Sequence, residues 1–230
     1  MAGVVMSFAM CTNCYAGNFF TDLFTSKPKV GETIIFGNYY LVNEKKLEPL
    51  EWQVLDVQDG KALLITKYCI IGRPYHKEFK DITWAESEIR SWLNSDFFFT
   101  AFNAEERGRI ADTFVINTEN TKYGTPGGVN TTDKIFLLSI AEVQQYFKND
   151  EVRRAKATPF AKMRGAWVSD DGLCWWWLRS PGRDQLHAAG VYYDGVNTLG
   201  YVLNDGSVYA YGNNVDNVRA AARAALWLNL

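Results

Sequence analysis

The sequence predicts one α+β domain in which antiparallel sheets are flanked by a few helices. Alternating apolar residues indicate strands at Thr33–Tyr40 and Leu50–Val57. The turn signal Asp59-Gly60 then leads into a mostly apolar strand over Lys61–Ile71, so an antiparallel sheet is the expected arrangement. Helices follow, and the last third of the chain returns to strands and turns. Strands and helices grouped in this way are typical of α+β folds.

Each expected helix begins with a capping residue followed three positions later by Glu, a pair that satisfies free amide groups in the first turn. The three helices, with their capping pairs, run from Thr83-x-x-Glu86 to about Asn94, from Asn103-x-x-Glu106 to about Ala111, and from Ser139-x-x-Glu142 to about Phe147. A short strand is expected at Lys134–Leu138. Residues 118–132 are rich in Gly, Thr and Asn and predict a loop. Residues 148–168 carry basic charge and predict an exposed connection.

The last third of the chain is expected to form short strands. The predicted strands are Cys174–Leu178, Ala188–Tyr193, Tyr201–Leu203, Ser207–Tyr211 and Ala224–Leu228. The sequence Asn204-Asp205-Gly206 between two of them is the strongest short hairpin signal in the chain. The tryptophans of Trp175–Trp177 alternate across a strand, so at least one must face away from the other two. Two of them are expected in the core.

Composition and charge argue against several functional classes. Of the 230 residues, 47% are hydrophobic and 22% are charged, as in ordinary globular domains. The net charge is −2, and no basic stripe with interleaved aromatic residues is present, which argues against a nucleic-acid partner. No apolar run reaches the roughly 18 residues that a transmembrane helix needs.

The first residues of the chain give no clear signal peptide, because the apolar run from Met1 to Met10 lacks a positively charged start. Phe8-Ala9-Met10-Cys11 has a weak likeness to a lipoprotein cleavage site, but Met10 stands where a small residue is expected. The alternative interpretation is a buried N-terminal segment.

Residues suited to catalysis or metal binding are few. Cys69 and Cys174 stand in apolar runs and are predicted to be buried free thiols. Cys11 and Cys14 form a C-x-x-C pair, but no second pair completes a zinc site and no βαβ pattern surrounds it. The two histidines share no ligand spacing with cysteines or carboxylates. We therefore expect no catalytic residue, no metal and no cofactor.

Two arginines and two acids leave alternatives open. Arg179 and Arg223 stand beside apolar strands and are expected to form structural ion pairs or to stack on tryptophan, the alternative being anion binding. Asp170 and Asp171 are expected to cap a turn, with calcium binding as the alternative.

Between the apolar stretches of the last third, Tyr, Asn, Asp, Gly and Arg dominate, and Lys and Glu are almost absent. Tyr supplies contact area at low entropic cost and small polar residues adapt to a partner, a mixture that antibody-like surfaces use. The alternative is a set of solvated turns with ordinary strand tyrosines. The predicted ligand-binding residues are Arg183, Asp184, His187, Tyr192, Tyr193, Asp194, Asn197, Tyr209, Tyr211, Asn213, Asn214, Asp216 and Asn217.

Five motifs stand out along the chain. They are Leu50-Glu51-Trp52-Gln53-Val54-Leu55-Asp56, Asp81-Ile82-Thr83-Trp84 leading into Ser91-Trp92-Leu93-Asn94, Asp133 to Ser139, Trp176 to Gly182, and Arg223 to Leu228. Taken together, they resemble a largely uncharacterised bacterial domain family with a C-type-lectin-like fold. The likeness covers roughly residues 29–230 and leaves residues 1–28 as an N-terminal extension. Members of this family look similar to the variable proteins of diversity-generating retroelements.

The resemblance implies that a C-terminal region, about residues 174–230, displays a ligand-binding face with variable positions within Gly182–Asn217. In retroelement variable proteins, adenine mutagenesis of AAY-type codons yields many residue types but never Gln, Glu, Lys, Met or Trp. In this stretch Gln185 is the only residue of that excluded set. The chain departs from the family pattern near its end, where Ala224 replaces a Pro.

The resemblance further implies a bacterial or phage protein that binds a ligand without catalysis, the ligand being a protein or glycan on a cell or phage surface. Calcium is not expected, because the Glu-Pro-Asn and Gln-Pro-Asp tripeptides of sugar-binding lectins are absent. One alternative is a fixed interaction module with the same fold. Another is an enzyme similar to formylglycine-generating enzymes, whose reactive cysteine pair would have to be Cys69 and Cys174. Their apolar surroundings argue against a thiolate.

Overall fold

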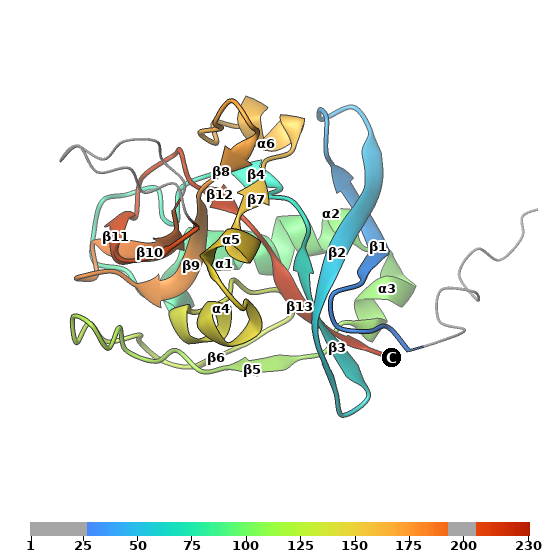
Figure 1. The fold of residues 1–230 in the computed structure, drawn as a ribbon, viewed down its shortest axis with the longest axis horizontal. Helices are drawn as coiled ribbons and strands as arrows, with labels where there is room; N and C mark the ends of the chain where they lie inside the picture. The colour runs from blue at the N-terminus through green and yellow to red at the C-terminus, as the bar shows by residue number, and fades with distance from the viewer. Residues whose placement is uncertain (1–26, 193–205) are drawn as a thin grey trace, which may run out of the picture.

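The computed structural model describes residues 27–192 and 206–230 and shows a mixed α+β architecture with several antiparallel sheets and a few short helices (Figure 1). Two sheets dominate. The first consists, in spatial order, of β1 (Thr33–Tyr40), β2 (Leu47–Gln58), β3 (Lys61–Thr66) and β13 (Ala225–Asn229), all antiparallel. The second consists, in spatial order, of β11 (Val208–Asn214), β10 (His187–Val191), β9 (Trp176–Pro181), β12 (Ala221–Ala222) and β4 (Ile71–Gly72), in which β9 and β12 run parallel.

Two antiparallel ribbons and several helical elements surround these sheets. The ribbons are β5 (Thr113–Val115) with β6 (Thr131–Asp133), and β7 (Ala155–Lys156) with β8 (Leu173–Cys174). The helical elements are a 3₁₀ turn η1 (Trp84–Glu86), α1 (Glu88–Trp92), a π-helical turn η2 (Leu93–Phe97), α2 (Phe98–Ala101), α3 (Ala104–Arg109), α4 (Ile140–Tyr146), α5 (Asp150–Arg153) and α6 (Pro159–Met163). Within the described ranges, none of these helices has the length and apolar character needed to cross a membrane.

The early strands agree with the expected ones, except that Lys61–Ile71 is wrong as a single strand. The chain leaves the first sheet after Thr66, whose amide donates to the carbonyl of Ala224 at 2.8 Å. It then enters the second sheet at β4, where the Ile70 amide donates to Ala222 at 2.9 Å. The intervening residues thus carry the chain from one sheet to the other. The predicted strand Tyr201–Leu203 lies outside the described residues.

Two of the three predicted capping boxes are confirmed, at Asn103 for α3 and at Ser139 for α4. The one at Thr83 is wrong, because the Thr83 side chain makes no bond to a backbone amide and is followed only by the short turn η1. Ser87 takes over the role, since its hydroxyl oxygen accepts the amide of Arg90 at 3.3 Å and α1 begins directly after it. The first helix therefore starts about four residues later than its sequence pattern suggested.

Two further segments differ from expectation. Lys134–Leu138 forms only an isolated β-bridge, between Phe136 and Ala225, because the side-chain oxygen of Asn94 takes the amides of Lys134 and Ile135 at 2.8 and 3.1 Å. Residues 148–168 are not an exposed connection, since they fold into α5, β7 and α6. This segment also buries Arg153 and Phe160. Basic side chains dominated its composition, whereas its few apolar residues determine its packing.

The strand β9 is buried along its whole length because both faces of the second sheet are covered. Trp175 packs edge-on against Trp177 with ring centroids 5.3 Å apart, whereas Trp176 contacts other partners. The indole nitrogens are also satisfied, with Trp177 donating to the carbonyl of Arg73 at 3.0 Å and Trp176 to that of Arg153 at 3.3 Å. All three tryptophans are therefore core residues, one more than the sequence predicted.

Arg223 lies between β12 and β13, at the point where the chain returns from the second sheet to the first. Its guanidinium carbon is 5.1 Å from the ring centroid of Trp176 and 5.5 Å from that of Phe147. The group donates to the carbonyls of Thr66 at 2.9 Å and Arg153 at 3.3 Å. Burial lowers its pKa, but the nearby thiols partly offset this effect. The expectation that Arg223 stacks on tryptophan in a structural role is confirmed.

Replacing Arg223 with Met tests this junction, since Met keeps an unbranched side chain but has no donor. The Thr66 carbonyl would lose its partner in the core, and a buried polar group without a partner costs about 1–3 kcal/mol. Together with the lost stacking, we expect the free energy of unfolding to fall by about 2 kcal/mol or more in urea titrations followed by tryptophan fluorescence. Arg164→Met, at a largely exposed ion pair with Glu44, should change it by less than about 1 kcal/mol. Equal stability of both variants would contradict the role of Arg223.

Candidate functional site

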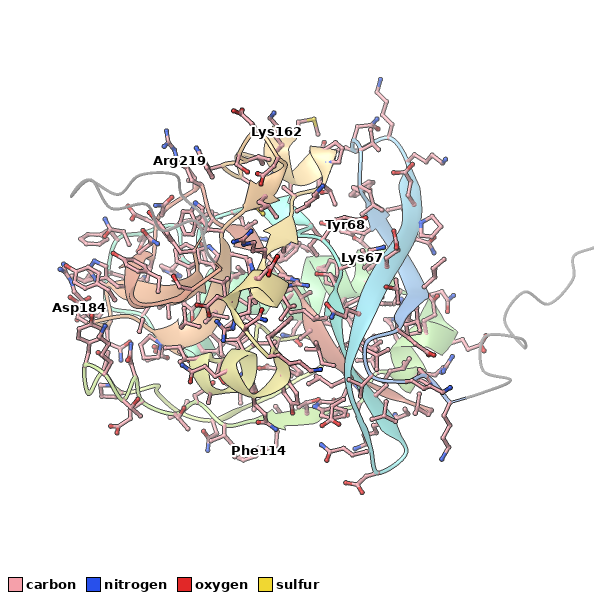
Figure 2. All side chains as sticks on the ribbon, in the orientation of Figure 1. Lys67, Tyr68, Phe114, Lys162, Asp184 and Arg219 are labelled. Carbon is pink, nitrogen blue, oxygen red and sulfur yellow. The ribbon has the colours of Figure 1, made fainter. Side chains whose placement is uncertain are left out.

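The predicted ligand-binding residues within the described ranges gather around β10, β11 and the turns beside them. These elements form one end of the molecule, where Asp184 projects outward, and the β2–β3 hairpin lies at the opposite end (Figures 1 and 2). Because β11 is the last strand of its sheet, its outer edge is free of strand partners within the described residues. Tyr193, Asp194 and Asn197 lie outside the described residues.

Four tyrosines form a continuous row on this end of the molecule. Tyr192 lies 5.0 Å from Tyr209, Tyr209 lies 5.9 Å from Tyr211, and Tyr211 lies 6.0 Å from Tyr123, measured between ring centroids. These distances lie in the range of favourable aromatic pairs. We call Tyr192, Tyr209, Tyr211 and Tyr123 the tyrosine row. Its first three members are half-buried and Tyr123 is exposed.

The tyrosine row rests on the buried core. Tyr192 is 6.1 Å from Trp175, which in turn packs on Trp177. Burial raises the pKa of Tyr209, so its hydroxyl stays protonated at neutral pH and can donate a hydrogen bond. Rings held on both sides by other rings lose little further freedom when a partner binds. The row is therefore a preorganised contact surface.

A charged group covers Tyr211, the third ring of the row. The Arg183 guanidinium lies 4.4 Å from the ring centroid of Tyr211, in cation–π contact, and its Nε is 3.3 Å from Asp184. Asp184 also contacts Nδ1 of His187 at 2.5 Å and accepts the Leu186 amide at 3.0 Å. Burial alone raises the pKa of Asp184, but His187, the Leu186 amide and Arg183 outweigh it and hold the pKa below its usual range. His187 is buried beneath Tyr211 and acts here as a support for Asp184.

The remaining predicted residues lie at the end of β11 and in the turn that follows it. Val215 is fully buried, and its amide donates to the carbonyl of Leu186 at 3.0 Å, which fixes the turn to the loop after β9. The side-chain oxygen of Asn217 accepts the Arg219 amide at 2.8 Å and so serves the turn itself. Asn214, the last residue of β11, is exposed, whereas the side-chain nitrogen of Asn213 is buried and has no hydrogen-bond acceptor among the described residues. Asn214 is therefore the better placed of the two to contact a partner molecule.

A loop outside the C-terminal region completes this surface. Residues 116–130 connect β5 to β6, and the sequence predicted only that a loop covers residues 118–132, the last two of which belong to β6. The buried side chain of Asn120 donates to the carbonyls of Pro181, Gly182 and Ala210 at 2.9, 3.1 and 2.7 Å. This contact brings Tyr123 against Tyr211. No local sequence signal marks Asn120, because its partners lie 61 to 90 residues further along the chain.

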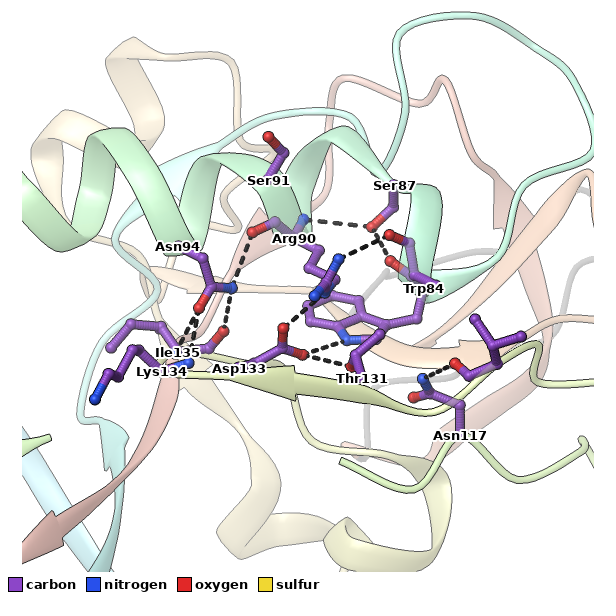
Figure 3. Close-up of polar contacts among 12 residues, drawn as sticks. Trp84, Ser87, Arg90, Ser91, Asn94, Asn117, Thr131, Asp133, Lys134 and Ile135 are labelled. Carbon is purple, nitrogen blue, oxygen red and sulfur yellow. Dashed lines mark hydrogen bonds and ion pairs between the residues drawn. The ribbon is translucent and has the colours of Figure 1, made fainter. Parts of the chain in front are cut away.

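The base of this loop is held by a buried carboxylate (Figure 3). Asp133 of β6 accepts hydrogen bonds from Nε of Arg90 at 2.7 Å, the indole of Trp84 at 2.9 Å and the hydroxyl of Thr131 at 2.7 Å. Its side chain is fully buried. Next to it, Asn94 connects α1 to the segment after β6 (Figure 3). The helical motif around Trp84 and Asn94 therefore serves to fix the ribbon from which the loop projects.

Comparison with known families identifies this chain. Residues 59–230 match the family model described as "Domain of unknown function (DUF6273)", which covers well over half of the sequence. The chain belongs to the DUF6273 family. The matched region starts in the β2–β3 turn and includes the tyrosine row and the loop 116–130. Searches of curated proteins and of solved structures gave no match.

The other side chains of this DUF6273 protein that were considered for anion binding or catalysis are buried in the core. Arg179 donates to both carboxylate oxygens of Glu142 and to the carbonyl of Leu137, as a structural ion pair was expected to do. Cys69 and Cys174 are buried free thiols, as predicted, and burial together with the neighbouring Cys69 raises the pKa of Cys174. Among the described residues, no group of three or more His, Cys, Asp or Glu side chains is arranged to hold a metal ion.

Replacing Asp133 with Ala tests how the ribbon below the loop is fixed. Removing one partner from a buried charge pair commonly costs 3–5 kcal/mol, and here two further donors lose their acceptor. We therefore expect the free energy of unfolding to fall by about 3 kcal/mol or more, measured by chemical denaturation. The matched control is Asp112→Ala, which removes a mostly exposed carboxylate from Lys134 and should cost less than about 1 kcal/mol. A small loss for Asp133→Ala would show that other contacts hold the ribbon.

Proposed function

We propose that this DUF6273 protein is a non-catalytic ligand-binding protein with a C-type-lectin-like fold. In this proposal it is the variable protein of a diversity-generating retroelement and displays a hypervariable face within Gly182–Asn217. The tyrosine row is the observation that carries the proposal. Partly exposed rings at a sheet edge that has no strand partner within the described residues, supported by a buried tryptophan, form an apolar surface of the kind that marks an interaction site.

The chemistry of the face supports recognition of a macromolecular surface. Tyrosines provide rigid apolar area with a polar tip, Arg183 adds a cation, and Asn213 and Asn214 add adaptable amide groups. The ligand is a protein or a glycan on a cell or phage surface. The mixed α+β architecture is compatible with the proposed lectin-like fold, and the resemblance of the sequence motifs supports it.

If a surface is to accept many different side chains, substitutions on it must change the free energy of unfolding much less than substitutions in the core. We expect Tyr211→Ala to lower the free energy of unfolding by less than about 1.5 kcal/mol, because the ring is only half-buried and its neighbours remain packed on one another. Trp177→Ala, the control two strands away in the same sheet, should cost about 3–5 kcal/mol because its ring is fully buried. Denaturation curves of both variants provide the measurement. Comparable losses would show that the row is part of the core and unsuited to variation.

Sequencing the gene in sibling genomes tests hypervariability directly. We expect substitutions to concentrate at AAY-type codons within Gly182–Asn217, with a near-identical template repeat and a reverse transcriptase gene close by. The segment Thr113–Asp133, which contains the β5–β6 ribbon and its loop, is a matched control and should stay constant. Substitutions scattered evenly over the chain would refute diversification and leave a fixed interaction module with the same face.

A further inference from the structure

The loop 116–130 is built as a rigid body. The backbone of Asn120 closes an internal turn, since its amide donates to Thr125 at 2.9 Å and its carbonyl accepts the amide of Gly124 at 2.7 Å. A side chain at Gly127 would place its Cβ 2.2 Å from the carbonyl oxygen of Asn117, so two parts of the loop are in contact there. The Asn117 side chain also donates to the carbonyl of Val129 at 2.8 Å. The loop therefore has little freedom to rearrange.

The same loop is fixed to the sheet that carries the tyrosine row. The three bonds from Asn120 reach the end of β9, the turn after it and β11. A second contact joins the side-chain nitrogen of Gln185 to the carbonyl of Pro126 at 2.5 Å. The loop and the ligand face therefore move as one unit.

The loop presents two side chains beside the row. The Tyr123 ring stands nearly perpendicular to that of Tyr211, at an interplanar angle of 82°. The Lys122 ammonium lies 5.5 Å from the Tyr123 ring centroid, and the Lys122 amide donates to the side-chain oxygen of Asn120 at 3.1 Å. Asn120 thus holds the sheet with its nitrogen and the start of the turn with its oxygen.

The charge at this end of the face is unbalanced. Arg183 and Lys122 place a cation over each of the two outer rings, and Asp184 is already shared between Arg183 and His187. Lys122 has no ion-pair partner among the residues that the structure describes. A carboxylate from a ligand would complement it, and complementary charge favours one partner over another.

We infer that Tyr123 and Lys122 form a constant wall of the ligand face, positioned by Asn120, and that this wall binds a carboxylate-bearing protein surface. This inference rests on the proposed function and deepens it. The wall comes from residues outside Gly182–Asn217, so every variant of the face shares it. Ligand choice is then set jointly by constant and variable contacts, and acidic protein surfaces are favoured in every variant.

Selection from a displayed library tests the inference with the full chain. Tyr192, Tyr209, Tyr211, Asn213, Asn214 and Asp216 would be randomised. The displayed library would be selected separately against an acidic probe protein, serum albumin, and a basic one, hen egg lysozyme. Enriched clones would then receive Tyr123→Ala, Lys122→Ala, Asn120→Ala or, as a control, Phe114→Ala. Phe114 is an exposed aromatic residue on the same ribbon that points away from the face (Figure 2).

We expect Tyr123→Ala to weaken albumin binding about tenfold or more, as truncation of an aromatic hot-spot residue does. Lys122→Ala should weaken albumin binding about threefold or more at low salt and leave lysozyme binding unchanged. Phe114→Ala should change the dissociation constants for albumin and for lysozyme by less than about twofold. Asn120→Ala should weaken binding when Tyr123 is present and have no further effect in the Tyr123→Ala background. A general loss of folding would instead weaken binding in both backgrounds.

The outcomes separate the two claims. If clones are enriched but Tyr123→Ala and Lys122→Ala leave their dissociation constants unchanged, the constant wall is refuted and the proposed binding face stands. If Lys122→Ala affects both probes equally, the preference for acidic surfaces is refuted. If no clone is enriched against either probe, the proposed function fails, and the inference fails with it.

Discussion

The buried guanidinium of Arg223 is the constraint on which the arrangement of the two large sheets depends. The chain crosses between them twice, after β3 and before β13, and Arg223 contacts both crossings. It also stacks on Trp176, the first residue of the central strand β9. A cation in the core is tolerable only when its donors and its flat faces are occupied, as they are here. Through these contacts Arg223 helps to fix the second sheet, which carries the tyrosine row, to the first.

From Trp177, the neighbour of Trp176 in β9, a series of aromatic contacts leads outward. Trp177 and Trp175 belong to the core, Tyr192 lies at its border, and Tyr209 and Tyr211 reach the solvent. Each ring packs against the next, and these contacts restrict the freedom of the outer rings. A surface of this kind loses little conformational entropy on binding, which is a large part of the cost of association. The core packing of β9 and the proposed recognition at β11 are therefore linked physically.

Local chemistry made part of this structure predictable from the sequence. The capping boxes at Asn103 and Ser139 depend on residues three positions apart, and both form as expected. Thr83 failed because Ser87, a second capping residue just downstream, starts the helix instead. The composition of the last third of the chain also predicted the polar and aromatic residues that lie around β10 and β11. Tyr123 was not predictable, because its place on the face depends on contacts of Asn120 with carbonyls 61 to 90 residues away.

The contacts of Asn120 have a consequence for how such a surface can evolve. All three acceptors are main-chain oxygens, and every amino acid presents the same carbonyl whatever its side chain. The three hydrogen bonds from Asn120 therefore do not depend on which side chains the accepting residues carry. Under the proposed function, side chains of the ligand face can change without loss of these three hydrogen bonds, provided that the backbone path is kept. Glycine at position 182 preserves that path, because an added Cβ would lie 2.6 Å from the Tyr211 carbonyl oxygen. For a face that is diversified as proposed, backbone geometry would therefore set the limit on which residues can change.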